Sequence, residues 1–111
     1  MINSYAWDTA IVYIQEFSED KDYSRQDGIS INASLTNTGA NLDELCKIND
    51  MASNTSEWTT EYSTYTDSTK GQPSTLRSGN YFNSNGYTSC RYYATVMDKY
   101  KGDTFRPILY I

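Results

Sequence analysis

Apolar residues recur at helical spacing near the amino end of the chain. They are Trp7, Ala10, Ile11, Ile14 and Phe17. Positions three and four apart share one face of a helix. The pattern therefore predicts a helix over residues 4–17, with Ser4 as its amino-terminal cap and the apolar stripe in the core.

The rest of the chain carries short apolar segments between polar, glycine-containing stretches, a pattern typical of strands and turns. Strands are expected at residues 46–49, 57–61, 75–82, 90–97 and 104–110, with a further short strand around Ile29 and Ile31. Residues 34–41 are rich in Ser, Thr, Asn and Gly and are expected to form a loop. The predicted fold class is α+β, with one N-terminal helix followed by short antiparallel strands and long loops in a single domain, residues 1–111.

The composition changes this picture in two ways. Hydrophobic residues make up 38% of the chain, and 11 tyrosines and 2 tryptophans supply much of that share, which indicates a thin but folded core. A net charge of -5 disfavours nucleic acid as a partner, because phosphate backbones are bound by clustered basic residues. No apolar run approaches the length of roughly 18 residues that insertion into a membrane requires.

Three segments occur in an order that matches a known family. Residues 50–59, 76–81 and 104–109 read DMASNTSEWT, LRSGNY and TFRPIL. They resemble the D-M-x-G-N-x-x-E-W-T, L-R-G-G-S-W and G-F-R-P/L-V-L blocks near the carboxyl end of formylglycine-generating enzymes and their C-type-lectin-like relatives. The predicted helix begins its stripe with WDTA, similar to the family's W-x-x-A. The resemblance implies a C-type-lectin-like (formylglycine-generating-enzyme-type) fold in a shortened or partial form.

Within these blocks, three residues are expected to serve the scaffold. The resemblance makes Trp58 a core anchor, Gly79 a point where the backbone bends, and Arg106 a planar donor that ties loop carbonyls or a carboxylate together. Three family glycines are replaced, by Ser53, Ser78 and Thr104.

Catalysis is not expected. An oxidase of the formylglycine type needs two thiols that bind copper, and the resemblance places Asn83 and Thr88 near those positions. Cys90 is close but single, and the chain has no His. Cys46 and Cys90 are expected to stay unpaired, since two cysteines without a secretion signal are weak evidence for a disulfide.

A binding function is indicated by residues 80–93, in which five of fourteen side chains are aromatic and most others are Asn, Ser, Thr, Gly or Arg. This composition is typical of a paratope. The resemblance places it where diversity-generating retroelements vary the sequence of non-catalytic relatives, which bind protein or glycan as phage receptor-binding tips or bacterial adhesins. The candidate ligand-binding residues are Asn80, Tyr81, Asn83, Asn85, Tyr87, Ser89, Arg91, Tyr92 and Tyr93.

Other interpretations remain open. The tyrosines could lie half-buried between strands, and the chain could be a structural subunit of a phage or pilus assembly whose edges pair across an oligomer interface. No cofactor is expected, although Asn54 and Glu57 offer oxygen ligands of the kind that structural calcium prefers. The favoured locations are a phage particle and the bacterial cell surface.

Overall fold

Helix α1, Ser4–Phe17, opens the computed structural model, which describes residues 1–25, 35–40, 43–62, 74–78, 87–94 and 103–108. The helix has the limits predicted from the sequence. Its cap is Asn3 and not Ser4, because Asn3 Oδ1 accepts a hydrogen bond of 2.7 Å from the Ala6 amide. Ser4 Oγ lies instead 3.3 Å from Thr59 Oγ1, within the domain.

The buried face of α1 is narrower than the predicted stripe. Trp7, Ile11 and Ile14 are buried, whereas Phe17 is exposed and its ring centroid lies 4.8 Å from that of Tyr13. The buried stripe therefore ends one turn before the end of the helix, and within the described residues Phe17 does not belong to the core cluster or pack against it.

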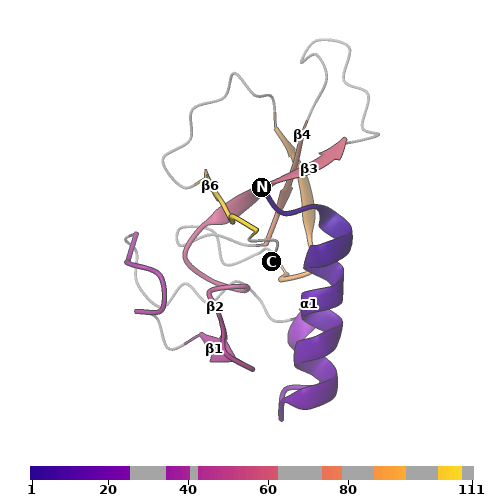
Figure 1. The fold of residues 1–111 in the computed structure, drawn as a ribbon, viewed down its shortest axis with the longest axis vertical. Coiled ribbons are helices and arrows are strands. Elements are labelled where there is room, and N and C mark those ends of the chain that lie inside the picture. The colour runs from indigo at the N-terminus through magenta and orange to yellow at the C-terminus, as the bar shows by residue number, and fades with distance from the viewer. Residues whose placement is uncertain (26–34, 41–42, 63–73, 79–86, 95–102, 109–111) are drawn as a thin grey trace.

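A four-stranded sheet lies beside α1, as Figure 1 shows, and a two-stranded hairpin lies nearer the carboxyl end of the helix. The sheet has the order β5-β4-β3-β6. After the short helix η1, Tyr23–Arg25, the strands are β1, Glu44–Leu45; β2, Ile48–Asn49; β3, Ser56–Tyr62; β4, Ser74–Arg77; β5, Arg91–Ala94; and β6, Asp103–Phe105. The domain is thus a small α+β domain with one N-terminal helix and two sheets.

Two expectations about the strands are wrong. Strand β6 runs parallel to β3, not antiparallel, with Glu57 opposite Thr104. The predicted strand 46–49 is a hairpin, because Cys46 and Lys47 form its turn with φ of 53° and 64°. The expected strand at Ile29 and Ile31, and the strand residues predicted at 79–82, 95–97 and 109–110, lie outside the described residues.

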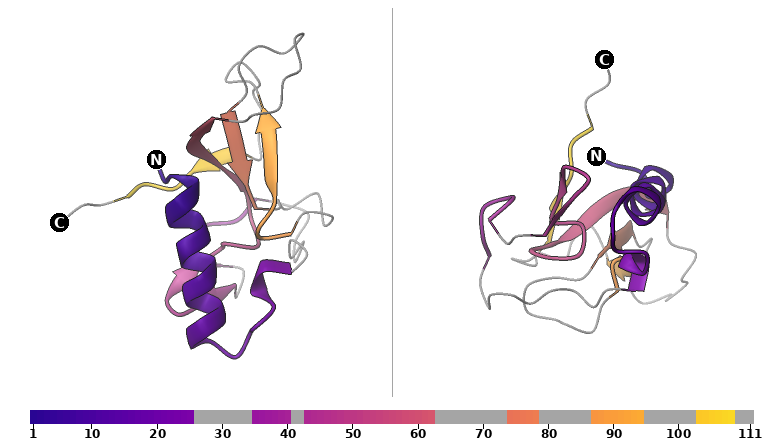
Figure 2. Two further views of the ribbon diagram at one scale, coloured as in Figure 1. Left: turned by 90° about the vertical axis from the view of Figure 1, so that its right-hand side faces the viewer. Right: turned by 90° about the horizontal axis from the view of Figure 1, so that it is seen from below.

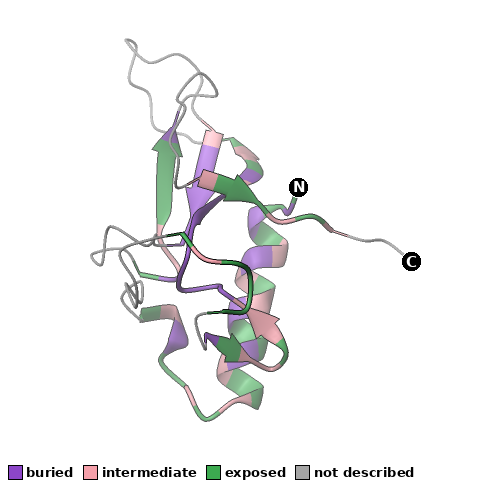
Figure 3. Cartoon of the chain, turned by 90° about the vertical axis from the view of Figure 1, so that its left-hand side faces the viewer, coloured by how far each residue is buried: buried purple, intermediate pink, exposed green. Residues whose placement is uncertain are grey.

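The core lies between α1 and the segment that leads into β3. Its buried cluster consists of Ile2, Trp7, Ile11, Ile14, Tyr23, Met51 and Ala52. Figure 3 shows buried residues along one side of the helix and along residues 50–57. A segment without regular structure thereby supplies part of the core.

Buried Asp43 holds this irregular segment in place. Its carboxylate accepts hydrogen bonds of 2.9 Å from the Tyr23 hydroxyl and 3.0 Å from both the Ala52 amide and the Ser53 hydroxyl. Burial, followed by the charge of Asp43, raises the pKa of Tyr23 above its usual range. Ser78, at φ 73°, adds a bond of 2.6 Å from its hydroxyl to the Met51 carbonyl. Polar groups that would be costly to bury are therefore satisfied by one another.

The core tryptophan is Trp7 and not Trp58. Trp7 is fully buried, and the guanidinium carbons of Arg77 and Arg106 lie 5.9 Å and 5.8 Å from its ring centroid. Both distances are within reach of a cation–π interaction. Trp58 is only partly buried, and strand alternation places it on the sheet face that carries Leu76 and not on the face that carries Arg77 and Glu57.

Candidate functional site

Five of the nine predicted ligand-binding residues lie in the described part of the chain, on β5 and the turn before it. They are Tyr87, Ser89, Arg91, Tyr92 and Tyr93. Asn80, Tyr81, Asn83 and Asn85 lie outside the described residues, as does Gly79. The site can therefore be followed in its second half.

Four of these five side chains are exposed at one edge of the four-stranded sheet. Tyr87 is 49% exposed, Tyr92 36% and Tyr93 38%, so each ring is accessible on part of its surface and covered on the rest. Strand alternation sends Tyr92 to one face of the sheet and Arg91 and Tyr93 to the other. We call Tyr87, Arg91, Tyr92 and Tyr93 the β5-edge surface.

The fifth residue, Ser89, belongs to the scaffold. Its hydroxyl donates a hydrogen bond of 2.7 Å to the Ser24 carbonyl, and its amide donates a second of 3.2 Å to the same oxygen. The hydroxyl proton of Ser89 is therefore used inside the domain, and the ligand contact predicted for this residue stays a prediction.

The main-chain oxygens of residues 88–90, just before β5, are held by two buried side chains from other elements. Trp7 Nε1 donates to the Thr88 carbonyl at 3.2 Å. Arg77 donates from Nε to the Cys90 carbonyl at 3.0 Å and from Nη2 to the Ser89 carbonyl at 3.2 Å. Three successive carbonyls are thus fixed by buried donors, which positions the backbone before β5 without using the side chains of Tyr87, Tyr92 and Tyr93.

Asp8 links the helix to this edge. Its carboxylate accepts bonds of 2.5 Å from fully buried Arg77 and 2.6 Å from Arg91, and Arg91 also lies 3.3 Å from Glu61. Burial raises the pKa of Asp8, but the hydrogen bonds and charges of Arg77 and Arg91 outweigh burial, and the pKa falls below its usual value. Asp8 is therefore a carboxylate at neutral pH.

A shallow hollow next to Arg91 extends the surface toward the start of α1. It has a volume of about 430 Å³ and includes Tyr5, Asp8 and Glu61 among its lining residues. Sequence reasoning missed these three, although the polar face of the predicted helix already placed Tyr5 outside the core. The pairing of Asp8 with two distant arginines carries no local sequence signal.

Tyr92 interacts with Cys90, two positions before it on the chain. Burial, followed by the hydrogen bond and charge of Cys90, raises the pKa of Tyr92 to about 12. Cys90 and Cys46 are both free thiols in the structure. Tyr92 therefore keeps its hydroxyl proton at neutral pH and can act as a hydrogen-bond donor.

The oxygens considered for calcium already have protein partners. Asn54 Oδ1 accepts from the Thr36 amide at 3.2 Å, and both Glu57 oxygens accept from Arg106, at 2.9 Å and 2.8 Å. Arg106 also donates to the Asn49 carbonyl at 3.0 Å, so it ties β3 to the preceding hairpin. In the described ranges, no group of three or more His, Cys, Asp or Glu side chains is arranged to hold a metal ion.

Comparison with known proteins adds no relative. No protein-family model matches the chain, and neither the curated proteins nor the solved structures include a significant match. Within the described residues, no helix has the length and apolar character needed to cross a membrane.

Proposed function

We propose that the chain is a non-catalytic display module of the C-type-lectin-like kind, a variable receptor-binding or adhesin protein that binds a protein or glycan through the β5-edge surface and residues 80–85. The observation that carries the proposal is how residues 88–90 are held. Trp7 and Arg77 bind their carbonyl oxygens, while the side chains of the β5-edge surface are exposed to solvent.

This arrangement suits recognition by exchangeable side chains. A hydrogen bond to a carbonyl survives any substitution of the side chain on the same residue, so the scaffold does not depend on which residues it displays. Tyrosine offers a large rigid contact area at low entropy cost, and Arg91 adds planar donors at the same edge.

The arrangement of the three sequence blocks supports the proposed fold. Residues 50–59, 76–81 and 104–109 include parts of β3, β4 and β6, and β3 lies between the other two. Arg106 of the last block forms a bidentate ion pair with Glu57 of the first. Segments that resemble family blocks at three distant places in the sequence thus meet in one sheet.

A structural subunit of a phage or pilus assembly is the alternative, and the edge position of β5 favours it. Strand edges can pair with a second chain, and among the described strands β5 has a neighbour only on the β4 side. A chain that stays folded as a monomer in sedimentation analysis supports a display module, and folding only on assembly supports the structural alternative.

The binding proposal is tested with a triple variant, Tyr87→Ser, Tyr92→Ser and Tyr93→Ser. The wild-type chain and the variant are compared on a glycan array and by flow cytometry on a panel of intact bacteria. We expect the variant to lose at least about tenfold in apparent affinity, because exposed tyrosines dominate such interfaces. It should stay folded, because the anchoring bonds end on main-chain atoms.

The matched control is a Tyr13→Ser and Phe17→Ser variant, which removes exposed aromatic rings from the carboxyl half of α1. This variant should bind like the wild type. Equal loss of binding in both variants, or no difference between the triple variant and the wild type, would contradict the proposal.

A further inference from the structure

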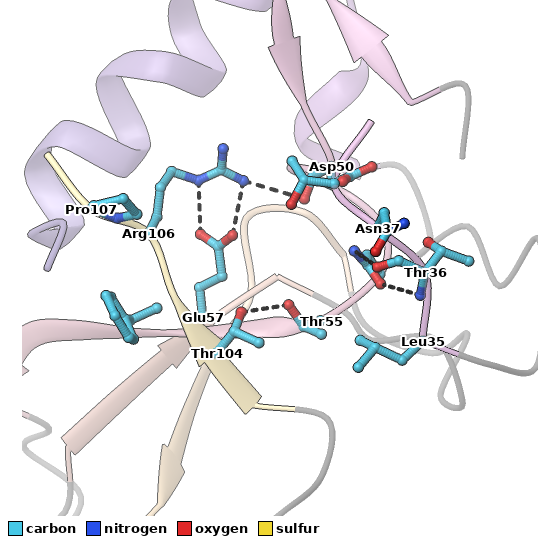
Figure 4. A pocket seen from close by; sticks show the side chains of 12 residues that line it. Leu35, Thr36, Asn37, Asp50, Thr55, Glu57, Thr104, Arg106 and Pro107 are labelled. Atoms are coloured by element: carbon cyan, nitrogen blue, oxygen red, sulfur yellow. Dashed lines mark hydrogen bonds and ion pairs between the residues drawn. The ribbon is translucent and has the colours of Figure 1, made fainter. Parts of the chain in front are cut away.

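A cavity lies on the other side of the sheet, where β6 and the residues after it face the loop 35–38. It has a volume of about 350 Å³, within the range of roughly 300–1,000 Å³ that is usual for small-molecule sites. Figure 4 shows its lining, with the Glu57–Arg106 ion pair on one side and Thr36 and Asp50 on another.

The walls of the cavity are fixed by hydrogen bonds. Asn54 pairs with the main chain of Thr36, accepting from its amide at 3.2 Å and donating to its carbonyl at 3.1 Å. Gly39 donates its amide to Asp50 Oδ2 at 2.8 Å. Thr55 and Thr104 are joined through their hydroxyls at 2.6 Å. These bonds join the loop to the segment before β3 and join that segment to β6.

Two lining residues, Asp50 and Thr36, each have a buried oxygen, Oδ1 and Oγ1, that has no hydrogen-bond partner among the described residues. Asp50 is only 4% exposed, and it adopts a φ of 56°. Leaving a buried carboxylate oxygen without a donor is costly, and most buried polar atoms in native proteins are bonded. A buried carboxylate oxygen that has no hydrogen-bond donor and belongs to a residue lining a cavity indicates a ligand with an N–H or O–H group.

The charge of the lining narrows the class of ligand. Asp50 and Glu57 contribute two carboxylates and Arg106 one guanidinium, and both oxygens of Glu57 are bonded to Arg106. Among the lining residues, the Asp50 carboxylate therefore has no basic side chain as an ion-pair partner. Calcium would need six to eight oxygen ligands, and those of Asn54 and Glu57 are engaged.

The rim of the cavity is apolar. Leu35 is 53% exposed and Phe105 62%, and Figure 4 shows Leu35 on the loop side of the cavity and Pro107 on the opposite side, after β6. A short alkyl chain could lie between these apolar side chains while its polar end points toward Asp50.

We propose that this cavity binds an alkylammonium group, whose N–H groups donate to Asp50 Oδ1 and Thr36 Oγ1 and whose methylenes lie against Leu35 and Phe105. The group belongs either to a free primary amine or to a lysine side chain of a partner. The site is separate from the β5-edge surface, at the opposite edge of the sheet, and does not depend on the function proposed for that surface.

The test is a titration of the isotope-labelled chain with n-pentylammonium chloride, followed by NMR. The Gly39 and Thr36 amides are the reporters, because each donates to a residue that lines the cavity. Two probes serve as controls at equal ionic strength: 1-pentanol has the alkyl chain without the charge, and tetramethylammonium has the charge without N–H donors. We expect saturable shifts with n-pentylammonium alone.

Two variants make the test specific. Asp50→Asn keeps an acceptor for Gly39 and suits a positive φ, and it should weaken binding at least about tenfold because it removes the charged acceptor. Thr36→Val removes a hydroxyl that has no protein partner and should weaken binding by a smaller factor. Unchanged affinity in Asp50→Asn, or equal shifts with either control probe, would overturn the proposal.

A further titration distinguishes the two sources of the group. Nα-acetyl-lysine methylamide carries the same ammonium on a peptide backbone. Tighter binding of this compound than of n-pentylammonium assigns the cavity to a lysine side chain of a partner, and weaker binding assigns it to a free amine. If neither compound binds, the proposed alkylammonium site is wrong.

Discussion

The two edges of the four-stranded sheet are built differently, although Trp7 contacts the anchoring arginine of each. At the β5 edge, buried side chains bind main-chain carbonyls and the displayed side chains are exposed to solvent. At the β6 edge, most of the bonds join side chains, in the Glu57–Arg106 and Thr55–Thr104 pairs, and Arg106 also donates to the Asn49 carbonyl. The first edge can change its displayed tyrosines without loss of the bonds to the carbonyls of residues 88–90, although Arg91 there is paired with Asp8, whereas the second edge depends on its own side-chain pairs.

The two edges are formed by different strands. Figure 2 shows β5 and β6 on opposite sides of β3 and β4. Strand β5 joins by regular antiparallel pairing, residue for residue from Ser74–Ala94 to Arg77–Arg91. Strand β6 is parallel and short, and the residues after it leave the sheet toward the core, where Ile108 packs. One edge thus offers an open surface and the other a cavity.

The largest expected effect comes from removing the anchor of the β5 edge. Arg77→Met leaves the Ser89 and Cys90 carbonyls without their donor inside the domain. We expect the free energy of unfolding to fall by about 3 kcal/mol, since each unsatisfied buried group costs about 1–3 kcal/mol. Urea denaturation followed by tryptophan fluorescence measures it.

Arg91→Met is the matched control, because Arg91 pairs with the same carboxylate of Asp8 but is 48% exposed. Its effect should stay within about 1 kcal/mol, as is usual for exposed ion pairs. Equal costs for both variants would mean that burial of the anchor does not distinguish the two arginines.

A smaller, pH-dependent effect is expected from Arg106→Met, which leaves Glu57 buried without its partner. Burial already raises the pKa of Glu57, against the opposing effect of Arg106, and the negative charge of Asp50 raises it further. An unfolded Glu titrates near pH 4.3. The raised folded pKa therefore gives stability that is fully present below about pH 4 and is lost as the pH rises through the folded value.

The difference in stability between the wild type and Arg106→Met should consequently grow from pH 4 to pH 7, reaching about 2 kcal/mol. Adding Glu57→Gln to the variant should remove this growth, because the neutral amide does not titrate. A difference that is the same at both pH values would show that the charge of Glu57 is not what Arg106 compensates.

The smallest effect tests the cavity. Asp50→Asn should raise the free energy of unfolding by about 0.5 kcal/mol, because burying a neutral amide costs less than burying a carboxylate oxygen without a donor. Thermal unfolding at pH 7 measures the change. Clear destabilisation would mean that the charge of Asp50 serves the scaffold and would remove the reason to expect a ligand there.

Local pattern predicted the helix well and the sheet only in part. The spacing of Trp7, Ile11 and Ile14 defines the buried face of α1, and the limits of the helix match. The cap moved by one residue because Asn and Ser are both good caps and stand side by side at positions 3 and 4. The hairpin turn was not predicted, because the two residues that adopt a positive φ there are Cys46 and Lys47 and not glycine, the usual sequence signal of such a turn.

The sequence could nominate candidate site residues only by residue type. Tyrosine and arginine in residues 87–93 pointed to the β5-edge surface, but nothing local indicated that Ser89 bonds to Ser24 or that Arg77 bonds to Asp8, 69 positions away. The parallel direction of β6 was missed for the same reason, since periodicity reports which face a residue takes and not which strand lies beside it.

The parallel pairing of β3 with β6 also sets an order of events in folding. Strand β3 ends at Tyr62 and β6 begins only at Asp103, so closing this pair brings together segments far apart in the chain. Such long-range closure loses entropy before it gains contacts, and it slows folding. Glu57 obtains its buried partner only when Arg106, 49 positions later in the chain, has been made, so this ion pair can form only after β6 is available.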